Sequence, residues 1–223
     1  MKSNLSKRFY TSLSLITLLS VSLFLNKYTW LILLMVGSII SFHEYNELIK
    51  KAFRKKNYLI FFFQITNFLF FITFLIVGYS MYDFPPTSLI FIILICIFSD
   101  TGGYFIGKLI GGKKLTKISP NKTISGSLGS FVFSLFPLIL YIIIYEFTGN
   151  SNFNIKNLSN IICLSLFLSL VCQAGDLFIS YFKRKAKVKD TGLILPGHGG
   201  LLDRIDGLIF VIPAAYIIDE LIF

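Results

Sequence analysis

Charged residues are scarce in this sequence. Only 14% of its 223 residues are Asp, Glu, Lys or Arg, whereas 55% are hydrophobic, and the mean hydropathy is +0.76. Such a chain cannot cover itself with a polar surface, which excludes an ordinary soluble domain. The formal net charge of +10 would suggest nucleic acid as a partner, but no soluble domain is present to carry a binding face. We therefore expect no nucleic-acid partner.

Cysteine is scarce as well. Cys96, Cys163 and Cys172 all lie in apolar runs, without a CxxC or other metal-ligand spacing. This excludes thiolate metal sites and indicates small core residues rather than disulfides. A small-x-small cleavage site is also missing after the basic N-terminus, and a second apolar run begins at once. The sequence therefore favours an uncleaved first span over a signal peptide.

The apolar segments predict an all-α, polytopic integral membrane protein with about seven transmembrane helices. The expected spans are residues 9–25, 28–43, 58–79, 87–109, 127–146, 161–182 and 204–222. The first two are short and joined by Asn26 and Lys27, which predicts a tight helical hairpin. We expect residues 1–57 to form this hairpin with a basic cytoplasmic loop, and residues 58–223 to form the catalytic part of one continuous membrane domain.

Lys and Arg residues define the expected orientation, because they accumulate in cytoplasmic loops. With the N-terminus inside, 19 of the 21 Lys and Arg fall on the inner side, and only Lys27 and Lys156 lie outside. The predicted location is the cell (inner) membrane, with active-site loops in the cytoplasm and the C-terminus outside.

Two helix features are expected within the spans. Pro137 should kink the fifth span, because proline cannot donate the backbone hydrogen bond of a helix. Gly103, Gly107 and Gly111 repeat every four residues along the fourth predicted helix and just beyond its span, which indicates close helix packing through small residues.

Asp100 and Asp176 lie within predicted spans, near their cytoplasmic ends. A carboxylate there is costly and is therefore a functional candidate, with a structural salt bridge to a neighbouring lysine as the alternative. Asp176, Ser180 and Lys183 follow one helical face. Asp100 and Lys108 share a similar stripe.

The segment 180–206, SYFKRKAKVKDTGLILPGHGGLLDRID, is the most informative stretch. Its five Lys/Arg within residues 183–189 can donate to phosphate, and its glycines allow backbone N–H groups to approach anionic oxygens. Asp203 and Asp206, three apart at the start of a helix, lie on one face and can hold Mg²⁺. His198 stands between two glycines, with a catalytic role and a loop-ordering hydrogen bond as alternatives.

A second polar loop, residues 111–129, contains Ser119-Pro-Asn-Lys-Thr123. Its hydroxyls, its lysine and a turn fixed by proline suit triphosphate oxygens. By itself this pattern is common on cytoplasmic faces.

Together these motifs resemble the phosphatidate cytidylyltransferase (CDP-diacylglycerol synthase) family. The resemblance rests on Lys-Asp-x-Gly followed by Leu-Pro-Gly-His-Gly-Gly-x-x-Asp-Arg-x-Asp at 189–206, and on Ser-Asp-Thr-x-x-Tyr at 99–104 before the Ser119 loop. It covers about residues 92–212. Many members have Glu where this chain has Ser125, and many bacterial members carry extra spans.

The resemblance implies that CTP and phosphatidate react to give CDP-diacylglycerol and pyrophosphate. The metal ligands are then expected to be Asp176, Asp203 and Asp206, with Mg²⁺ as the metal and a monovalent cation such as K⁺ allowed. Lys183 and His198 complete the expected catalytic set. The expected substrate-binding residues are Asp100, Ser119, Asn121, Lys122, Thr123, Ser180, Arg184, Lys189 and Arg204. CTP, phosphatidate and membrane lipid are the expected partners, and a homodimer is allowed.

Two alternatives remain at this point. A CTP-dependent polyprenol or phytol kinase belongs to a related membrane class, but the complete His-Gly-Gly-x-x-Asp-Arg-x-Asp pattern argues against it. A transporter would also carry intramembrane acids, yet the broken-helix repeats of transporters are missing from the sequence.

Overall fold

The computed structural model describes residues 2–84, 86–147 and 158–222. Over these residues the chain is helical and has no β-strand beyond two isolated bridges, so the expected all-α class is confirmed. The chain divides into two compact units. The first comprises Met1–Pro86 with Phe178–Asp206, and the second comprises Thr87–Leu177 with Gly207–Phe223.

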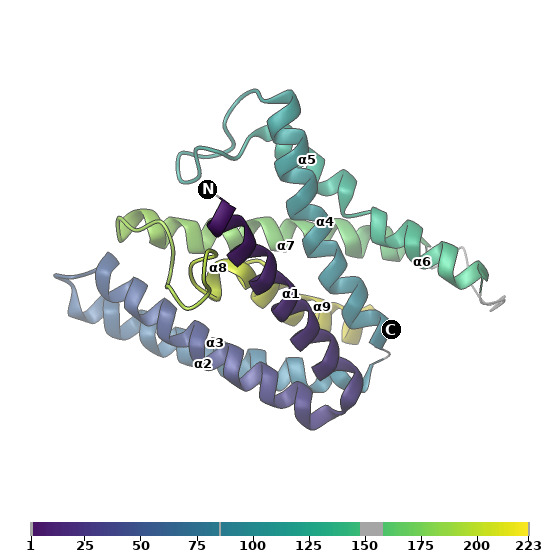
Figure 1. The fold of residues 1–223 in the computed structure, drawn as a ribbon, viewed down its shortest axis with the longest axis horizontal. Helices are drawn as coiled ribbons and strands as arrows, with labels where there is room; N and C mark the ends of the chain where they lie inside the picture. Colours follow the sequence, from purple (N-terminus) through teal and green to yellow (C-terminus); the bar gives the residue numbers. More distant parts are fainter. Residues whose placement is uncertain (1, 85, 148–157, 223) are drawn as a thin grey trace. The chain divides into compact units, whose positions relative to one another are not determined.

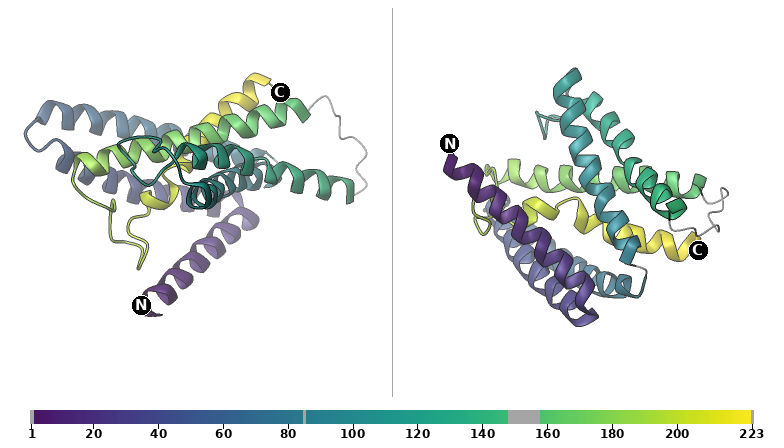
Figure 2. Two further views of the ribbon diagram at one scale, coloured as in Figure 1. Left: turned by 90° about the horizontal axis from the view of Figure 1, so that it is seen from above. Right: turned by 45° about the vertical axis from the view of Figure 1, so that its right-hand side comes forward.

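The first unit is a set of helices. Its two central helices, Lys27–Ala52 and Asn57–Ser80, run side by side (Figures 1 and 2). Its elements are α1 (Lys2–Leu25), α2 (Lys27–Ala52), α3 (Asn57–Ser80), the 3₁₀ helix η1 (Met81–Asp83), the C-terminal turns of α7 (Leu158–Lys185) and α8 (Leu202–Ile205).

The expected tight connection between the first two helices is present, because only Asn26 separates α1 from α2. Asn26 Oδ1 accepts from Thr29 N at 2.9 Å, and Asn26 N donates to Thr29 Oγ1 at 3.3 Å. This reciprocal capping satisfies backbone donors that the first turn of α2 would otherwise leave open. A polar side chain thus sets the start of a long apolar helix.

Large aromatic side chains hold α2 and α3 together. Trp30 is buried, and its Nε1 donates to Gly78 O at 2.7 Å. At the other end of the pair, Phe53 and Phe63 stack with ring centroids 5.2 Å apart, and Phe182 of α7 meets Phe63 edge to face at 5.2 Å. Such pairs add to the stabilisation from apolar burial alone.

Among its described residues, the second unit contains the N-terminal part of α7 and four further helices. These are α4 (Pro86–Ile110), α5 (Ile124–Phe133), α6 (Phe136–Phe147) and α9 (Leu208–Ile222). The expected outer loop with Lys156 falls within 148–157, outside the described residues.

Pro137 has a larger effect than the expected kink. The predicted span 127–146 is two helices, since α5 ends at Phe133 and α6 begins at Phe136. Proline has no N–H to donate to the carbonyl four residues earlier, but it fits the first turn of a new helix. The last predicted span, 204–222, also differs from the structure. Its helix α9 begins only at Leu208, after the short α8.

Glycines bring α4 and α5 into close approach, in agreement with the packing expected from the glycine repeat. A Cβ added at Gly129 would lie 2.5 Å from Ile106 Cβ, and one added at Gly103 would lie 2.5 Å from Ser130 Oγ. Gly107 faces Thr123 in the same contact. The third member of the repeat, Gly111, follows α4 with φ of 64° and belongs to the turn instead.

Within the described residues, four helical segments are long and apolar enough to cross a membrane: Ser6–Leu25, Asn57–Asp83, Thr87–Ile110 and Leu158–Lys185. Two shorter apolar segments are Ile124–Leu140 and Leu208–Ile218. The chain is a membrane protein on this basis. The second predicted span, within α2, is not among the four, because its helix continues into a charged second half.

Candidate functional site

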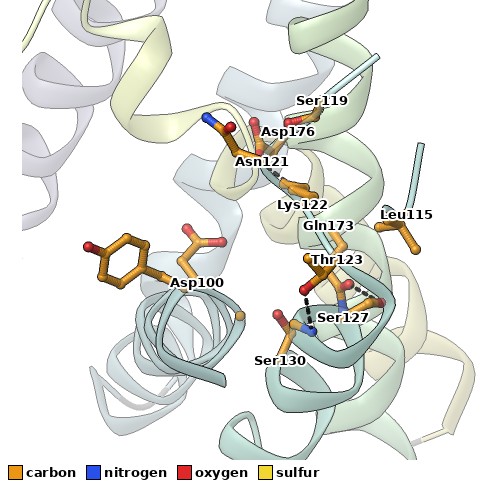
Figure 3. Close-up of a pocket in the computed structure, with 13 residues that line it drawn as sticks. Asp100, Leu115, Ser119, Asn121, Lys122, Thr123, Ser127, Ser130, Gln173 and Asp176 are labelled. Carbon is orange, nitrogen blue, oxygen red and sulfur yellow. Dashed lines mark hydrogen bonds and ion pairs between the residues drawn. The ribbon is translucent and has the colours of Figure 1, made fainter. Parts of the chain in front are cut away.

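A cavity of about 310 Å³ in the second unit, hereafter the Lys122 pocket, collects residues from α4, the polar loop, α5 and α7. Six of the predicted site residues line it: Asp100, Ser119, Asn121, Lys122, Thr123 and Asp176. Figure 3 shows Asp100 on one helix, with Lys122 and Asp176 together on another side of the cavity. The Ser-Asp-Thr-x-x-Tyr motif at 99–104 and the Ser119–Thr123 motif, about twenty residues apart in sequence, thus form one site with Asp176.

The charges of the Lys122 pocket are two carboxylates and one ammonium group. Lys122 Nζ forms an ion pair with Asp176 Oδ2, and the two side chains are 28% and 26% exposed. Asp100 lines the same cavity, and its Oδ1 lies 3.9 Å from Cys172 Sγ. With both carboxylates ionised, the charges that line the pocket sum to a negative value.

Backbone hydrogen bonds hold the polar loop in a compact turn under this pocket. Leu115 N donates to Lys122 O at 2.8 Å, and Ile124 N donates to Lys113 O at 3.0 Å. Thr123 Oγ1 caps α5 by accepting from Gly126 N at 3.0 Å. The side chain of Lys122 is therefore presented from an ordered loop immediately before a helix start.

Ser125 has a structural role in this chain. Its Oγ donates to Gly111 O and lies 3.0 Å from Thr123 Oγ1. These contacts connect the end of α4 to the start of α5.

A chain of hydrogen-bonded polar side chains runs from the pocket into the helices, and sequence reasoning did not predict it, because scattered serines are its only sign in the sequence. Ser127 Oγ donates to Gln173 Oε1 at 2.6 Å, and Gln173 Nε2 donates to Ser169 Oγ at 3.4 Å. Ser169 Oγ lies 2.8 Å from Ser99 Oγ, both side chains being fully buried. Satisfied hydrogen bonds of this kind join α4, α5 and α7.

The second group of predicted residues lies in the first unit, on the segment between α7 and α8. Asp203 is at its centre, with a side chain only 5% exposed. Its Oδ1 accepts from Lys183 Nζ at 2.8 Å, while its Oδ2 accepts from Thr191 N at 2.7 Å and from Gly200 N at 3.1 Å. Residues 186–201, hereafter the glycine loop, are thus folded around one carboxylate.

His198 contacts α1 rather than a carboxylate. Its Nδ1 lies 2.5 Å from Thr11 Oγ1, and its backbone carbonyl accepts from Arg204 Nη2 at 3.0 Å. Partial burial, together with the charges of Arg204 and Arg8, holds the pKa of His198 below its ordinary value of 6.5. A neutral ring fits a loop-ordering hydrogen bond, and its catalytic role stays a prediction.

The remaining predicted residues are distributed along the same segment. Ser180 is buried on α7, Arg184 is exposed in its last turn, Lys189 is exposed in the glycine loop, and Asp206 follows α8. Glu44 was not predicted as a site residue, yet this buried side chain of α2 accepts from Leu202 N at 2.8 Å.

Comparison with known proteins now identifies the family. The model of the cytidylyltransferase family matches residues 68–222, which is more than half of the chain. The chain belongs to the cytidylyltransferase family. The match includes the Lys122 pocket and the glycine loop, whereas Glu44 and Thr11 precede it.

Individual relatives agree with this assignment. A phosphatidate cytidylyltransferase of Staphylococcus saprophyticus is 44% identical over 127 residues, which are 56% of this chain and 46% of that protein. A protein of the same name from Helicobacter pylori is 39% identical over 132 residues, or 57% of this chain and 45% of that protein. The chain spans about half the length of the curated relatives it matches.

The predicted metal ligands of this cytidylyltransferase-family chain lie in different units. Asp176 belongs to the second unit, and Asp203 and Asp206 belong to the first. Among the described residues, no group of three or more His, Cys, Asp or Glu side chains is arranged to hold a metal by itself. The oxygen donors of the Lys122 pocket, from carboxylates, amides and hydroxyls, nevertheless suit Mg²⁺, which also takes ligands from phosphate and water.

The ion pair in the Lys122 pocket yields a stability prediction. Asp176→Asn should lower the free energy of unfolding by about 1–3 kcal/mol, because it leaves the Lys122 ammonium without this partner. The double variant Lys122→Met/Asp176→Asn should recover at least about 1 kcal/mol of this loss. Thermal unfolding of the detergent-purified proteins without nucleotide measures both effects. Additive losses in the double variant would show that the two side chains are not energetically coupled.

Proposed function

We propose that this chain transfers the cytidylyl group of CTP to phosphatidate, giving CDP-diacylglycerol and pyrophosphate for phospholipid biosynthesis. The observation that carries the proposal is the Lys122 pocket within a cytidylyltransferase-family chain, where a lysine, hydroxyls and two carboxylates converge. Two relatives with 44% and 39% identity bear the name of this activity. The two substrates of this reaction fit a membrane protein, because phosphatidate is a lipid and CTP is soluble.

In the proposed reaction, a phosphate oxygen of phosphatidate attacks the α-phosphorus of CTP. The new P–O bond forms as the bond between the α-phosphorus and the bridging oxygen breaks, and pyrophosphate leaves with that electron pair. The attacking oxygen is already anionic near neutral pH, so a strong general base is not required. The main requirement is to bring two anions together and to stabilise the leaving group.

The residues of the chain divide this task. Lys122 and the loop hydroxyls of Ser119 and Thr123 would bind phosphate oxygens of CTP. The basic side chains of Arg184, Lys189 and Arg204 would attract the anionic lipid head group, and Lys183 would orient Asp203. Asp100 would orient a cation or Lys122 from the opposite side of the pocket.

Mg²⁺ belongs to this proposal, with Asp176, Asp203 and Asp206 as ligands and a monovalent ion such as K⁺ as a second cation. When bound, such ions neutralise charge on the triphosphate and on pyrophosphate. The negative lining of the Lys122 pocket supports a cation requirement, since Lys122 alone cannot offset two carboxylates. At Asp203, Oδ2 accepts from two backbone N–H donors and Oδ1 accepts from Lys183 Nζ, so a metal bound through Oδ1 would have to displace Lys183.

The membrane arrangement is also part of the proposal. Seven spans with a cytoplasmic N-terminus would place 19 of 21 Lys and Arg inside. Both polar loops would then meet soluble CTP in the cytoplasm at the inner leaflet, where phosphatidate is accessible. The longer helices would cross directly, and α5 with α6 would cross as a broken pair. A homodimer is compatible with this arrangement.

Orientation is testable by cysteine labelling in sealed vesicles, after the three native cysteines have been replaced. A membrane-impermeant reagent added outside should modify a cysteine introduced at residue 222 and leave Asp190→Cys unmodified. Permeabilising the vesicles should then expose Asp190→Cys, which controls for its intrinsic reactivity. Outside labelling at 190 but not at 222 would contradict the proposed orientation.

The activity is tested with purified protein, Mg²⁺, phosphatidate and CTP labelled at either the α- or the γ-phosphorus. Cytidylyl transfer should carry only the α label into the lipid fraction and release the γ label as pyrophosphate. Asp203→Asn and Asp206→Asn should each lower the rate by about 100-fold or more. Asp83→Asn is the matched control, because Asp83 belongs to neither polar loop in the sequence and pairs with Lys27 at 2.6 Å.

Transfer of the γ label to a polyprenol, without α-label transfer to phosphatidate, would instead establish a kinase and refute the proposed reaction. Near-parent rates of both aspartate variants at limiting Mg²⁺ would refute their assignment as ligands.

A further inference from the structure

Glu44 of α2 is a buried carboxyl group that neither the sequence motifs nor the proposed reaction use. Only 6% of the surface of Glu44 is exposed. Among the ion pairs of the described residues, none includes Glu44, so no Lys or Arg in that part of the chain neutralises it at salt-bridge distance. Burial of such a group is costly unless hydrogen-bond donors replace water.

Donors from the glycine loop and from the start of α8 supply that replacement. Oε1 of Glu44 accepts from Leu201 N at 3.1 Å, and Oε2 accepts from Leu202 N at 2.8 Å. Thr191 Oγ1 lies 3.1 Å from the same Oε2. One side chain of the second helix therefore satisfies two consecutive backbone N–H groups more than 150 residues later in the chain.

Glycines make this approach possible. A Cβ added at Gly200 would lie 2.6 Å from Glu44 Oε2, and one added at Gly192 would lie 2.8 Å from Glu44 Cδ. At Gly192 only Glu44 would have to move, whereas at Gly200 the added atom would also meet Thr191 Oγ1 and lie 2.7 Å from Gly192 N, so Thr191 and the backbone would have to move as well. Gly192 and Gly200 thus have a physical role within the Lys-Asp-x-Gly and His-Gly-Gly motifs, which is to admit the carboxyl group of Glu44 between two stretches of backbone.

Thr191 links Glu44 to Asp203. Its hydroxyl lies 3.0 Å from Asp203 Oδ2 as well as 3.1 Å from Glu44 Oε2, while its backbone N–H donates to Asp203. Leu201 and Leu202, whose N–H groups Glu44 accepts, immediately precede Asp203. The position of Asp203 relative to Lys183 therefore depends on the same contacts that hold the loop to α2.

We propose that Glu44 is a positioning residue for the glycine loop, and that α2 thereby completes a site whose recognised family match begins only at residue 68. Glu44 acts through the backbone of Leu201 and Leu202 and through Thr191, and it sets the geometry of Asp203 and Arg204. The effect on turnover rests on the proposed function, whereas the effect on the loop does not.

Glutamine at this position cannot reproduce the contacts. Both oxygens of Glu44 accept from backbone N–H donors, so in either orientation an amide would direct its NH₂ group at one of those N–H groups. Glu44→Gln keeps the size and shape of the side chain and removes one acceptor. The matched control is Glu47→Gln, because Glu47 lies on the same helix with a side chain 57% exposed and pairs with Lys50 at 2.8 Å.

The experiment compares the parent, Glu44→Gln and Glu47→Gln by hydrogen exchange and by steady-state turnover of CTP and phosphatidate. Glu44→Gln should increase amide exchange at Leu201 and Leu202 by about 10-fold or more, because it weakens a charge-assisted hydrogen bond. Exchange in α2 and α3 should stay at the parent rate, and kcat should fall by about 10-fold or more. Glu47→Gln should match the parent in every measurement.

Three results would overturn the proposal: unchanged exchange at Leu201 and Leu202, a uniform increase throughout the helices of the first unit, or local loosening with a parent-like kcat. If Glu44→Gln does not fold, Thr191→Val provides the second test, since it removes the bridging hydroxyl and keeps the shape. It should raise exchange in the glycine loop and lower kcat, and parent-like values for both would again overturn the proposal. A parent that transfers no cytidylyl group would refute the proposed function, while the exchange data would still test the contact.

Discussion

Carboxylates on apolar helices are the constraint on which this structure depends. Asp176 lies on α7, a helix long and apolar enough to cross a membrane, where an isolated charge is costly. Lys122 provides the counter-charge from a loop that is too polar to enter the bilayer. The ion pair therefore joins the loop to the helix, and it brings the loop hydroxyls to Asp176. The electrostatic requirement of the fold and the assembly of the Lys122 pocket have the same physical origin.

Buried carboxylates also organise the glycine loop, but here their partners are backbone N–H donors. Its sixteen residues, numbered 186–201, have no regular helix or sheet to satisfy their N–H groups, apart from one bridge between Leu195 and Gly199. Asp203 accepts from Thr191 N and Gly200 N, and Glu44 accepts from Leu201 N and Leu202 N. Two buried carboxyl groups thus replace secondary structure as the organising element, and the loop can present basic side chains in a fixed geometry.

Sequence reasoning predicted the features that depend on residues close together in the sequence. The scarcity of charge predicted an all-α membrane protein, the aspartates within apolar runs predicted costly groups with polar partners, and the serine-lysine motif predicted a loop that lines a site. Pro137 was recognised, but whether a proline bends a helix or divides it depends on packing around Ser134 and Leu135. Glu44 was not predicted as a site residue, because its partners are backbone N–H groups more than 150 residues away, and no residue type reports such a contact.

The central claim is that the Lys122 pocket binds the triphosphate of CTP, and it is tested most directly by CTP affinity with Mg²⁺ present. Isothermal titration of the detergent-purified parent, Lys122→Met and Lys117→Met makes the comparison, since Lys117 lies exposed on the same loop and does not line the pocket. The account predicts that Lys122→Met weakens CTP binding by about 10-fold or more, because a charge-assisted contact to phosphate is lost, and that Lys117→Met binds as the parent does. Equal affinity of the parent and Lys122→Met would contradict the claim.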